Sequence, residues 1–85
     1  MAYEIIIKPS AEKSFARLEK AQQIKIVKAI ENLAVNPRPQ GFKKLKSLAE
    51  LYRIRVGDYR IIYSIDNNIL IIIVVKIGHR KEIYK

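Results

Sequence analysis

The first part of the chain places its apolar residues at helical spacing after one short run of β-branched residues. Residues 3–8 (YEIIIK) favour a strand, and Pro9 would end it because proline lacks a backbone donor. Ser10 is a good N-cap, so we expect a helix from there to about Lys20. A second helical stretch follows and ends at Asn36-Pro37, so the two segments predict a helical hairpin. Its apolar positions are Ala11, Phe15 and Leu18 in the first helix, and Ile24, Val27, Ile30, Leu33 and Ala34 in the second.

After residues 36–42 (NPRPQGF), which read as a loop, the apolar spacing becomes that of strands. Three strands are predicted at residues 51–56, 59–65 and 69–77, separated by Gly57-Asp58 and by residues 66–68 (DNN), which favour hairpin turns. Residues 70–75 are apolar at every position, which indicates a strand in the middle of the sheet. We therefore expect an α+β fold of order β-α-α-β-β-β. Its first strand joins an edge of an antiparallel sheet, and the helical hairpin covers one face.

Length, composition and charge narrow the classes of function. A chain of 85 residues can bury one core, so residues 1–85 should form a single domain with its site on the surface. Cysteine is absent and His79 is the only histidine, so we expect no disulfide, no metal site and no cofactor. The sequence shows neither a signal peptide nor the ~18 consecutive apolar residues of a membrane span, which favours a cytosolic location. The net charge of +9 attracts polyanions, nucleic acid first.

Three arginines of the predicted hairpin should lie on one face of the sheet. Side chains alternate along a strand, so Arg53 and Arg55 share a face. If Gly57-Asp58 is a two-residue turn, Arg55 stands opposite Arg60 of the next strand. Like charges facing each other typically cost about 0.2–1 kcal/mol, which indicates an anionic partner, and a guanidinium can bind phosphate through two hydrogen bonds. The alternative is a solvated face that discourages association between sheet edges.

A basic run precedes this hairpin. Lys43, Lys44 and Lys46 could follow a nucleic-acid backbone, or could belong to an ordinary solvated loop. Both interpretations stay open on the sequence alone.

The last residues, among them His79, Arg80 and Tyr84, should emerge close to the hairpin arginines. Taken singly, an exposed histidine and a tyrosine packed on the core are ordinary structural features. Beside the arginines they match the needs of metal-free RNA cleavage, which requires deprotonation of the ribose 2′-hydroxyl, stabilisation of the phosphorane and protonation of the leaving 5′-oxygen. Tyr84 and His79 are the candidates for proton transfer, and the arginines for charge stabilisation.

The run LYRIRVGDYRIIY at residues 51–63, followed by an apolar strand, Gly78-His79-Arg80 and Ile83-Tyr84, resembles the RelE toxins of bacterial and archaeal toxin–antitoxin pairs. The resemblance extends over the whole chain. It implies a ribosome-dependent endonuclease that enters the A site and cuts messenger RNA by attack of the 2′-hydroxyl, without a metal. It also implies a cognate antitoxin that wraps the helices and sheet. By position, the family's site residues correspond to Arg53, Arg55, Arg60, Arg80 and Tyr84.

This sequence departs from the resemblance at two positions, and two alternatives stay open. Well-known members carry lysines where this chain has Arg53 and Arg55, and arginine cannot transfer a proton as a lysine of lowered pKa can. The related ParE branch has a similar fold but poisons DNA gyrase, and the presence of Arg60, Arg80 and Tyr84 favours RelE instead. A non-catalytic RNA-binding module would need the basic face but not the terminal His-Arg-Tyr group.

Overall fold

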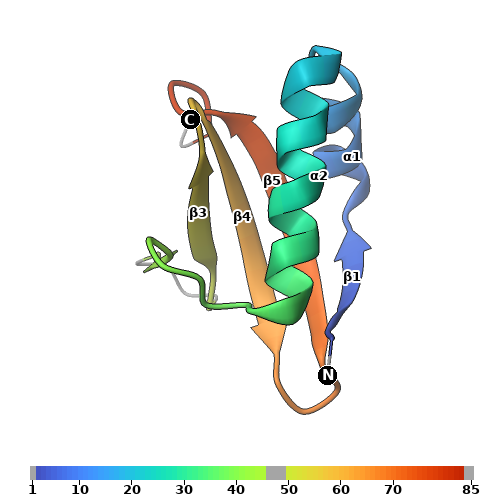
Figure 1. Cartoon of the computed structure of the whole chain (residues 1–85), viewed down its shortest axis with the longest axis vertical. Coiled ribbons are helices and arrows are strands. Elements are labelled where there is room, and N and C mark those ends of the chain that lie inside the picture. The colour runs from blue at the N-terminus through green and yellow to red at the C-terminus, as the bar shows by residue number, and fades with distance from the viewer. Residues whose placement is uncertain (1, 46–49, 84–85) are drawn as a thin grey trace.

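The computed structural model describes residues 2–45 and 50–83. In this part of the chain, two helices lie against a five-stranded sheet (Figure 1). The elements in chain order are β1 (Glu4–Ile7), α1 (Pro9–Ala16), α2 (Lys20–Val35), β2 (Lys43–Lys44), β3 (Tyr52–Val56), β4 (Tyr59–Asp66) and β5 (Ile71–His79).

The strand order is β1-β5-β4-β3-β2, which confirms that the first strand joins an edge and that the last lies inside the sheet. β1 pairs with β5 in parallel, and the other neighbours are antiparallel. The predicted α+β fold is thus confirmed, with one strand added. Lys43 and Lys44 pair with β3 as a short edge strand, and two residues are too few to show an alternating pattern in the sequence.

Several element boundaries differ from the prediction: α1 ends at Ala16 rather than at about Lys20, and β5 continues to His79 rather than ending at Ile77. Two starting points also differ, for identifiable reasons. α1 begins at Pro9 with Lys8 as its N-cap residue, so the prediction of an N-cap at Ser10 is wrong. Proline suits the first helical position, where its missing N–H would have no partner anyway. β5 begins at Ile71, two residues later than predicted, because Leu70 still belongs to the turn and has a positive φ of 55°.

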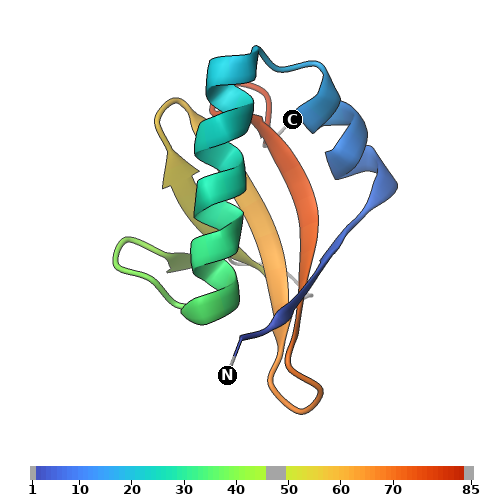
Figure 2. The same cartoon turned by 45° about the vertical axis from the view of Figure 1, so that its right-hand side comes forward.

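The core lies between α2 and one face of the sheet (Figure 2). α2 buries Ile26, Ile30 and Leu33, which recur at i, i+4 and i+7. The prediction that Ile24 and Val27 face the core is wrong, since these side chains are 50% and 43% exposed. α2 carries two adjacent apolar stripes, and helical spacing alone does not show which of them meets the sheet. The sheet contributes Ile54, Ile61, Tyr63, Ile72, Val74 and Ile77.

Within the described ranges, neither helix has the length and apolar character that a membrane crossing requires.

Candidate nucleic-acid interface

The β3–β4 register confirms the predicted arrangement of the hairpin arginines. Arg55 pairs with Arg60 across the two-residue turn, and Arg53 pairs with Ile62. Ile54 and Ile61, their neighbours along the strands, point into the core. By alternation, the three arginines therefore lie on the face of the sheet opposite the helices.

A bulge in β5 brings two further residues to this face. Ile62 pairs with Lys76 and Tyr63 with Val74, so Val75 is an extra residue without an opposite partner in β4. In a regular strand without a bulge, Lys76 would lie on the core-facing side with Val74. The inserted residue reverses the alternation, as bulges do, and places Lys76 and Gly78 beside Ile62 and Arg60.

The basic residues on this side lie in two neighbouring rows across the sheet. One row runs Lys43, Arg53, Ile62 and Lys76, and the next runs Arg55, Arg60 and Gly78. We call the five cations of these rows the arginine face: Lys43, Arg53, Arg55, Arg60 and Lys76. Lys44, the partner of Tyr52, alternates to the other side of the sheet. Lys46 lies outside the described residues.

The arginines differ in their exposure to solvent. Arg55 is exposed, whereas Arg53 and Arg60 are only 9% and 8% exposed. Arg60 Nη1 donates to the carbonyl oxygens of Tyr59 at 3.1 Å and Gly57 at 3.4 Å, so its guanidinium is held at the β3–β4 turn. A partly desolvated cation attracts an anion more strongly than a solvated one, since the local dielectric is lower.

The segment after β5 is tied to the same end of the sheet, as predicted. The backbone N–H of Arg80 donates to the Asp58 carbonyl oxygen at 2.8 Å, which joins this segment to the β3–β4 turn. Ile83 is 3% exposed and covers Gly78, where an added Cβ would lie 3.3 Å from Ile83 Cδ1. Lys76 Nζ also donates to the Ile83 carbonyl oxygen at 3.3 Å. Tyr84 lies outside the described residues, but its neighbour Ile83 is fixed on the arginine face.

His79 is not brought to the arginine face. It pairs with Tyr59, and the two rings meet edge to face with their centroids 5.5 Å apart, on the side of the sheet that carries the helices. Its Nδ1 accepts the backbone N–H of Lys81 at 3.1 Å, which places the proton of a neutral imidazole on Nε2. His79 therefore lies on the helix side of the sheet, and the edge of β5 separates it from the arginines.

The arrangement is suited to binding phosphate and stabilising negative charge. Basic side chains converge there from β2, β3, β4 and β5, and their N–H groups can donate hydrogen bonds to phosphate oxygens. Lys76 is the member that the sequence analysis missed. The available signal was that it is the one charged residue within the long apolar run of β5, but only the bulge determines its side.

Comparisons with known proteins agree with this architecture. A sequence model of the family described as "ParE toxin of type II toxin-antitoxin system, parDE" matches residues 5–84. A relative from Methanocaldococcus jannaschii, named "Putative toxin RelE1", is 33% identical over 88 residues and covers 100% of this chain and 98% of its own.

Solved structures give the same result. RelE in the archaeal RelE–RelB complex from Pyrococcus horikoshii has a TM-score of 0.84 at 30% identity, covering 96% of this chain and 99% of that one. The Escherichia coli RelBE complex has a TM-score of 0.80 at 21% identity, covering 92% and 96%, which supports the fold alone. The chain therefore belongs to the RelE/ParE superfamily of type II toxin–antitoxin toxins.

Proposed function

We propose that this toxin is a metal-independent endoribonuclease that enters the ribosomal A site and cuts messenger RNA there, which inhibits translation. The observation that carries the proposal is the pairing of Arg55 with Arg60 beside a turn whose Asp58 carbonyl oxygen accepts the backbone N–H of Arg80. Unfavourable clustering of like charge at one end of a small sheet is explained if a phosphate of the RNA backbone lies between these side chains.

The proposed reaction divides between charge stabilisation and proton transfer. The ribose 2′-oxygen attacks the adjacent phosphorus, the bond from phosphorus to the 5′-oxygen breaks, and a 2′,3′-cyclic phosphate forms. Arg53, Arg55, Arg60 and Arg80 would stabilise the charge that develops on the phosphorane oxygens. We assign proton transfer to Tyr84 in preference to His79. Ile83, the residue before Tyr84 in the sequence, lies on the arginine face, whereas His79 lies on the helix side of the sheet.

Primer extension on translated messenger RNA tests this proposal. The parent protein should produce cuts inside codons, and Arg80→Ala and Tyr84→Phe should abolish them. Arg38→Ala, which removes an exposed arginine from the loop after α2, is the matched control and should cut like the parent. Cutting by Arg80→Ala and Tyr84→Phe at the parental rate would contradict the assignment of these two residues.

A second candidate is inhibition of DNA gyrase, since the matching family model bears the ParE name. Purified gyrase provides the discriminating assay, because a ParE-like toxin would trap cleaved DNA on it whereas an endoribonuclease would not. A non-catalytic RNA-binding module would retain RNA without shortening it, so primer extension would show no cuts inside codons.

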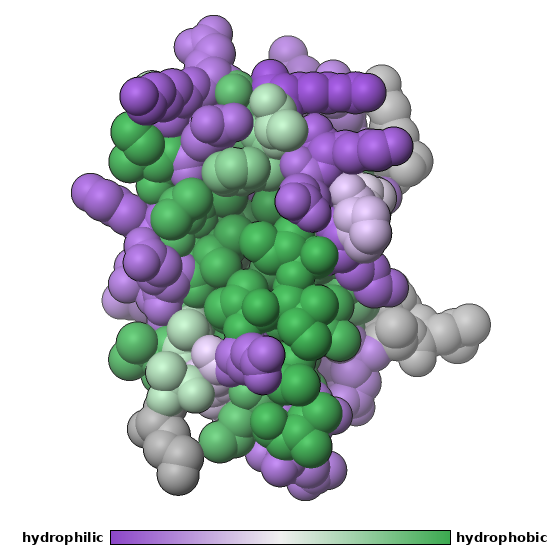
Figure 3. Space-filling view, turned by 90° about the vertical axis from the view of Figure 1, so that its right-hand side faces the viewer, coloured by the Kyte–Doolittle hydropathy of each residue, from purple (hydrophilic) through white to green (hydrophobic). Residues whose placement is uncertain are grey.

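We further propose that a cognate antitoxin binds this toxin, as RelB binds RelE in the complexes from Pyrococcus horikoshii and Escherichia coli. An apolar area lies uncovered on the side of the molecule that carries β1 and α1 (Figure 3). Ile7, Phe15, Val27 and Ile30 form a groove of about 190 Å³ there, between Glu12 and Glu31. Exposed apolar surface of this kind is typical of protein interfaces and fits the apolar side of an amphipathic segment.

A further inference from the structure

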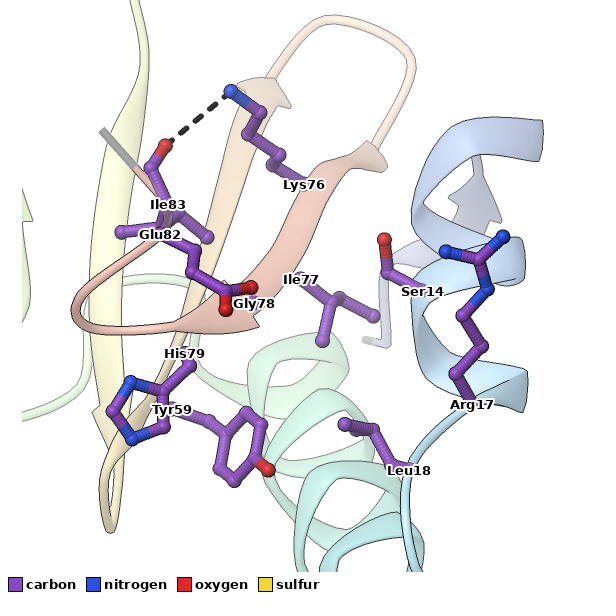
Figure 4. A pocket seen from close by; sticks show the side chains of 10 residues that line it. All are labelled: Ser14, Arg17, Leu18, Tyr59, Lys76, Ile77, Gly78, His79, Glu82 and Ile83. Atoms are coloured by element: carbon purple, nitrogen blue, oxygen red, sulfur yellow. Dashed lines mark hydrogen bonds between the residues drawn. The ribbon is translucent and has the colours of Figure 1, made fainter. Parts of the chain in front are cut away.

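A second cavity, of about 410 Å³, opens at the end of β5 between α1 and the segment after the strand (Figure 4). Its volume is within the range of about 300–1,000 Å³ in which proteins hold small ligands. The cavity is lined on one side by Lys76 and Gly78, which belong to the rows of the arginine face. On the other side it is lined by Arg17, next to the C-terminal end of α1.

The topology of the sheet leaves this space open. β1 pairs with β5 from Ile71 to Val74, and no other strand of residues 2–45 and 50–83 lies on the outer side of the later β5 residues. The turn between α1 and α2 lies opposite this edge and contributes Leu18 to the cavity. The opening therefore connects the arginine face with the helix side, around the edge of one strand.

The lining combines three kinds of chemistry. Arg17 and Lys76 supply a cation on each side, while Leu18, Ile77 and Ile83 supply apolar surface. The imidazole of His79 contacts the Tyr59 ring edge to face and accepts the backbone N–H of Lys81 at Nδ1, so an oriented ring borders the cavity. Apolar and aromatic surface does not help to bind a simple anion. A nucleotide has both a phosphate, which the cations can bind, and a flat base, which can stack on an aromatic ring.

One carboxylate gives the cavity a means of distinguishing bases. Glu82 projects from the segment after β5 back toward the end of that strand, and it is the one acidic residue in the lining of the cavity (Figure 4). An ionised carboxylate only accepts hydrogen bonds, so it favours a base that presents an amino group. Cytosine presents its N4 amino group where uracil presents the O4 oxygen, and the two bases are otherwise nearly identical in shape.

We propose that this cavity binds one nucleotide of an RNA strand whose next phosphates lie on the arginine face, with Arg17 on a phosphate and Glu82 on an amino group of the base. The inference rests on the proposed function in that both require RNA as the ligand. It adds a nucleotide subsite on the helix side of β5, and with it a base preference at one position of the strand.

Binding of single-stranded oligonucleotides, measured by fluorescence anisotropy at several salt concentrations, tests the phosphate contact. The slope of log K against log salt is negative, and loss of one phosphate contact reduces its magnitude by about 0.7 for a single strand. Arg17→Gln should reduce the magnitude of the slope by this amount. Lys13→Gln removes the same charge from the last turn of α1, at a position that does not line the cavity, and should leave the slope unchanged. Equal slopes for the two variants would overturn the subsite.

The base contact is tested with hexamers of cytidine and uridine in the same assay. The parent should bind the cytidine hexamer roughly threefold to tenfold more tightly, and Glu82→Ala should remove this preference without lowering the affinity for uridine. A parent without preference, or a preference that survives in Glu82→Ala, would refute the role of Glu82. Because no ribosome is present, these results are independent of whether the protein cuts messenger RNA, and failure here leaves the Arg80→Ala cleavage test unaffected.

Discussion

Arg55 and Arg60 face each other across one strand pair, yet their surroundings give them different roles in stability. Arg55 is exposed and has a like charge opposite it. Arg60 is buried, and its guanidinium donates to the carbonyl oxygens of Gly57 and Tyr59. Repulsion is therefore the main structural effect of Arg55, whereas Arg60 also stabilises the turn.

Replacement of each arginine by glutamine should separate these roles. Arg55→Gln should leave the free energy of unfolding unchanged or raise it by up to about 0.5 kcal/mol, because it relieves a cross-strand repulsion. Arg60→Gln should lower it by about 1–3 kcal/mol, because buried hydrogen bonds from a charged group are lost. Urea denaturation measures both values. Destabilisation of equal size in the two variants would show that Arg55 has a structural role as well.

Tyr63 illustrates a buried polar group with no part in the site. Its hydroxyl donates to the Pro37 carbonyl oxygen at 2.7 Å, and burial raises its pKa from 10.0 to about 12. In the unfolded chain the phenol ionises near 10.0, so the folded state holds the proton more tightly. The stability that this provides is complete below pH 10 and is lost as the pH rises toward about 12.

Tyr63→Phe should therefore change both stability and its dependence on pH. At neutral pH the free energy of unfolding should fall by about 1 kcal/mol, because the Pro37 carbonyl loses its donor. Between pH 9 and pH 11 the parent should lose stability more steeply than the variant, which has no phenol to ionise at this position. Urea titrations at these pH values provide the measurement, and parallel slopes would contradict the account of Tyr63.

Among the elements, β5 does most to assemble the site. Its bulge at Val75 places Lys76 and Gly78 on the arginine face, and the lack of a side chain at Gly78 leaves room for Ile83. Ile83 then fixes the point from which the chain continues to Tyr84. The position of Ile83 thus depends on one inserted residue, Val75, and on one small residue, Gly78.

A pair of substitutions tests the packing of Ile83 against Gly78. In Gly78→Ala the new methyl group would lie 3.3 Å from Ile83 Cδ1, so Ile83 must shift, and mRNA cleavage should slow. Ile83→Val removes Cδ1 and, in the double variant, should restore part of the cleavage rate. The free energies of unfolding of both single variants should fall by only about 1 kcal/mol. If the two substitutions act independently, the double variant will be slowed by the product of the two single reductions in cleavage rate. That result would contradict a direct contact between residues 78 and 83 as the cause of the slower cleavage.

The sequence was informative wherever a local pattern determined the structure. Alternation and the Gly57-Asp58 turn were sufficient to pair Arg55 with Arg60, because both features depend on neighbouring residues. The bulge at Val75 was not predictable, since every residue of 70–75 is apolar and the pattern carries no mark of an insertion. For the same reason, the separation of His79 from the arginines appeared only in the structure. The core stripe of α2 was also ambiguous, because Ile24 and Ile26 are equally apolar.

The whole molecule presents two contrasting surfaces. One is the arginine face of a chain with net charge +9, and the other is the apolar groove of Ile7, Phe15, Val27 and Ile30. We expect RNA on the first and the antitoxin on the second, since polyanions and apolar segments are attracted by different chemistry.

Two valines on α2 allow a matched test of the groove. Val27→Lys places a charge in the groove and should weaken binding of the cognate antitoxin by tenfold or more, roughly the effect of losing one anchor residue. Val35→Lys makes the same change at the exposed end of the same helix, where the side chain is 75% accessible, and should bind like the parent. Titration calorimetry gives both affinities. Equal binding by all three proteins would place the antitoxin elsewhere.

The central claim is that the arginine face binds and stabilises the phosphate that reacts. It is tested most directly by the single-turnover rate at which ribosome-bound messenger RNA is cut by the parent and by Arg55→Gln, whose fold should be intact. Lys44→Gln is the control, because it removes a charge from the other side of the sheet.

Loss of one preorganised charge at a reacting centre costs on the order of 10²–10³ in rate. We therefore predict that Arg55→Gln is slower by at least about a hundredfold while Lys44→Gln stays within about twofold of the parent. Cleavage by Arg55→Gln at the rate of Lys44→Gln would contradict the claim.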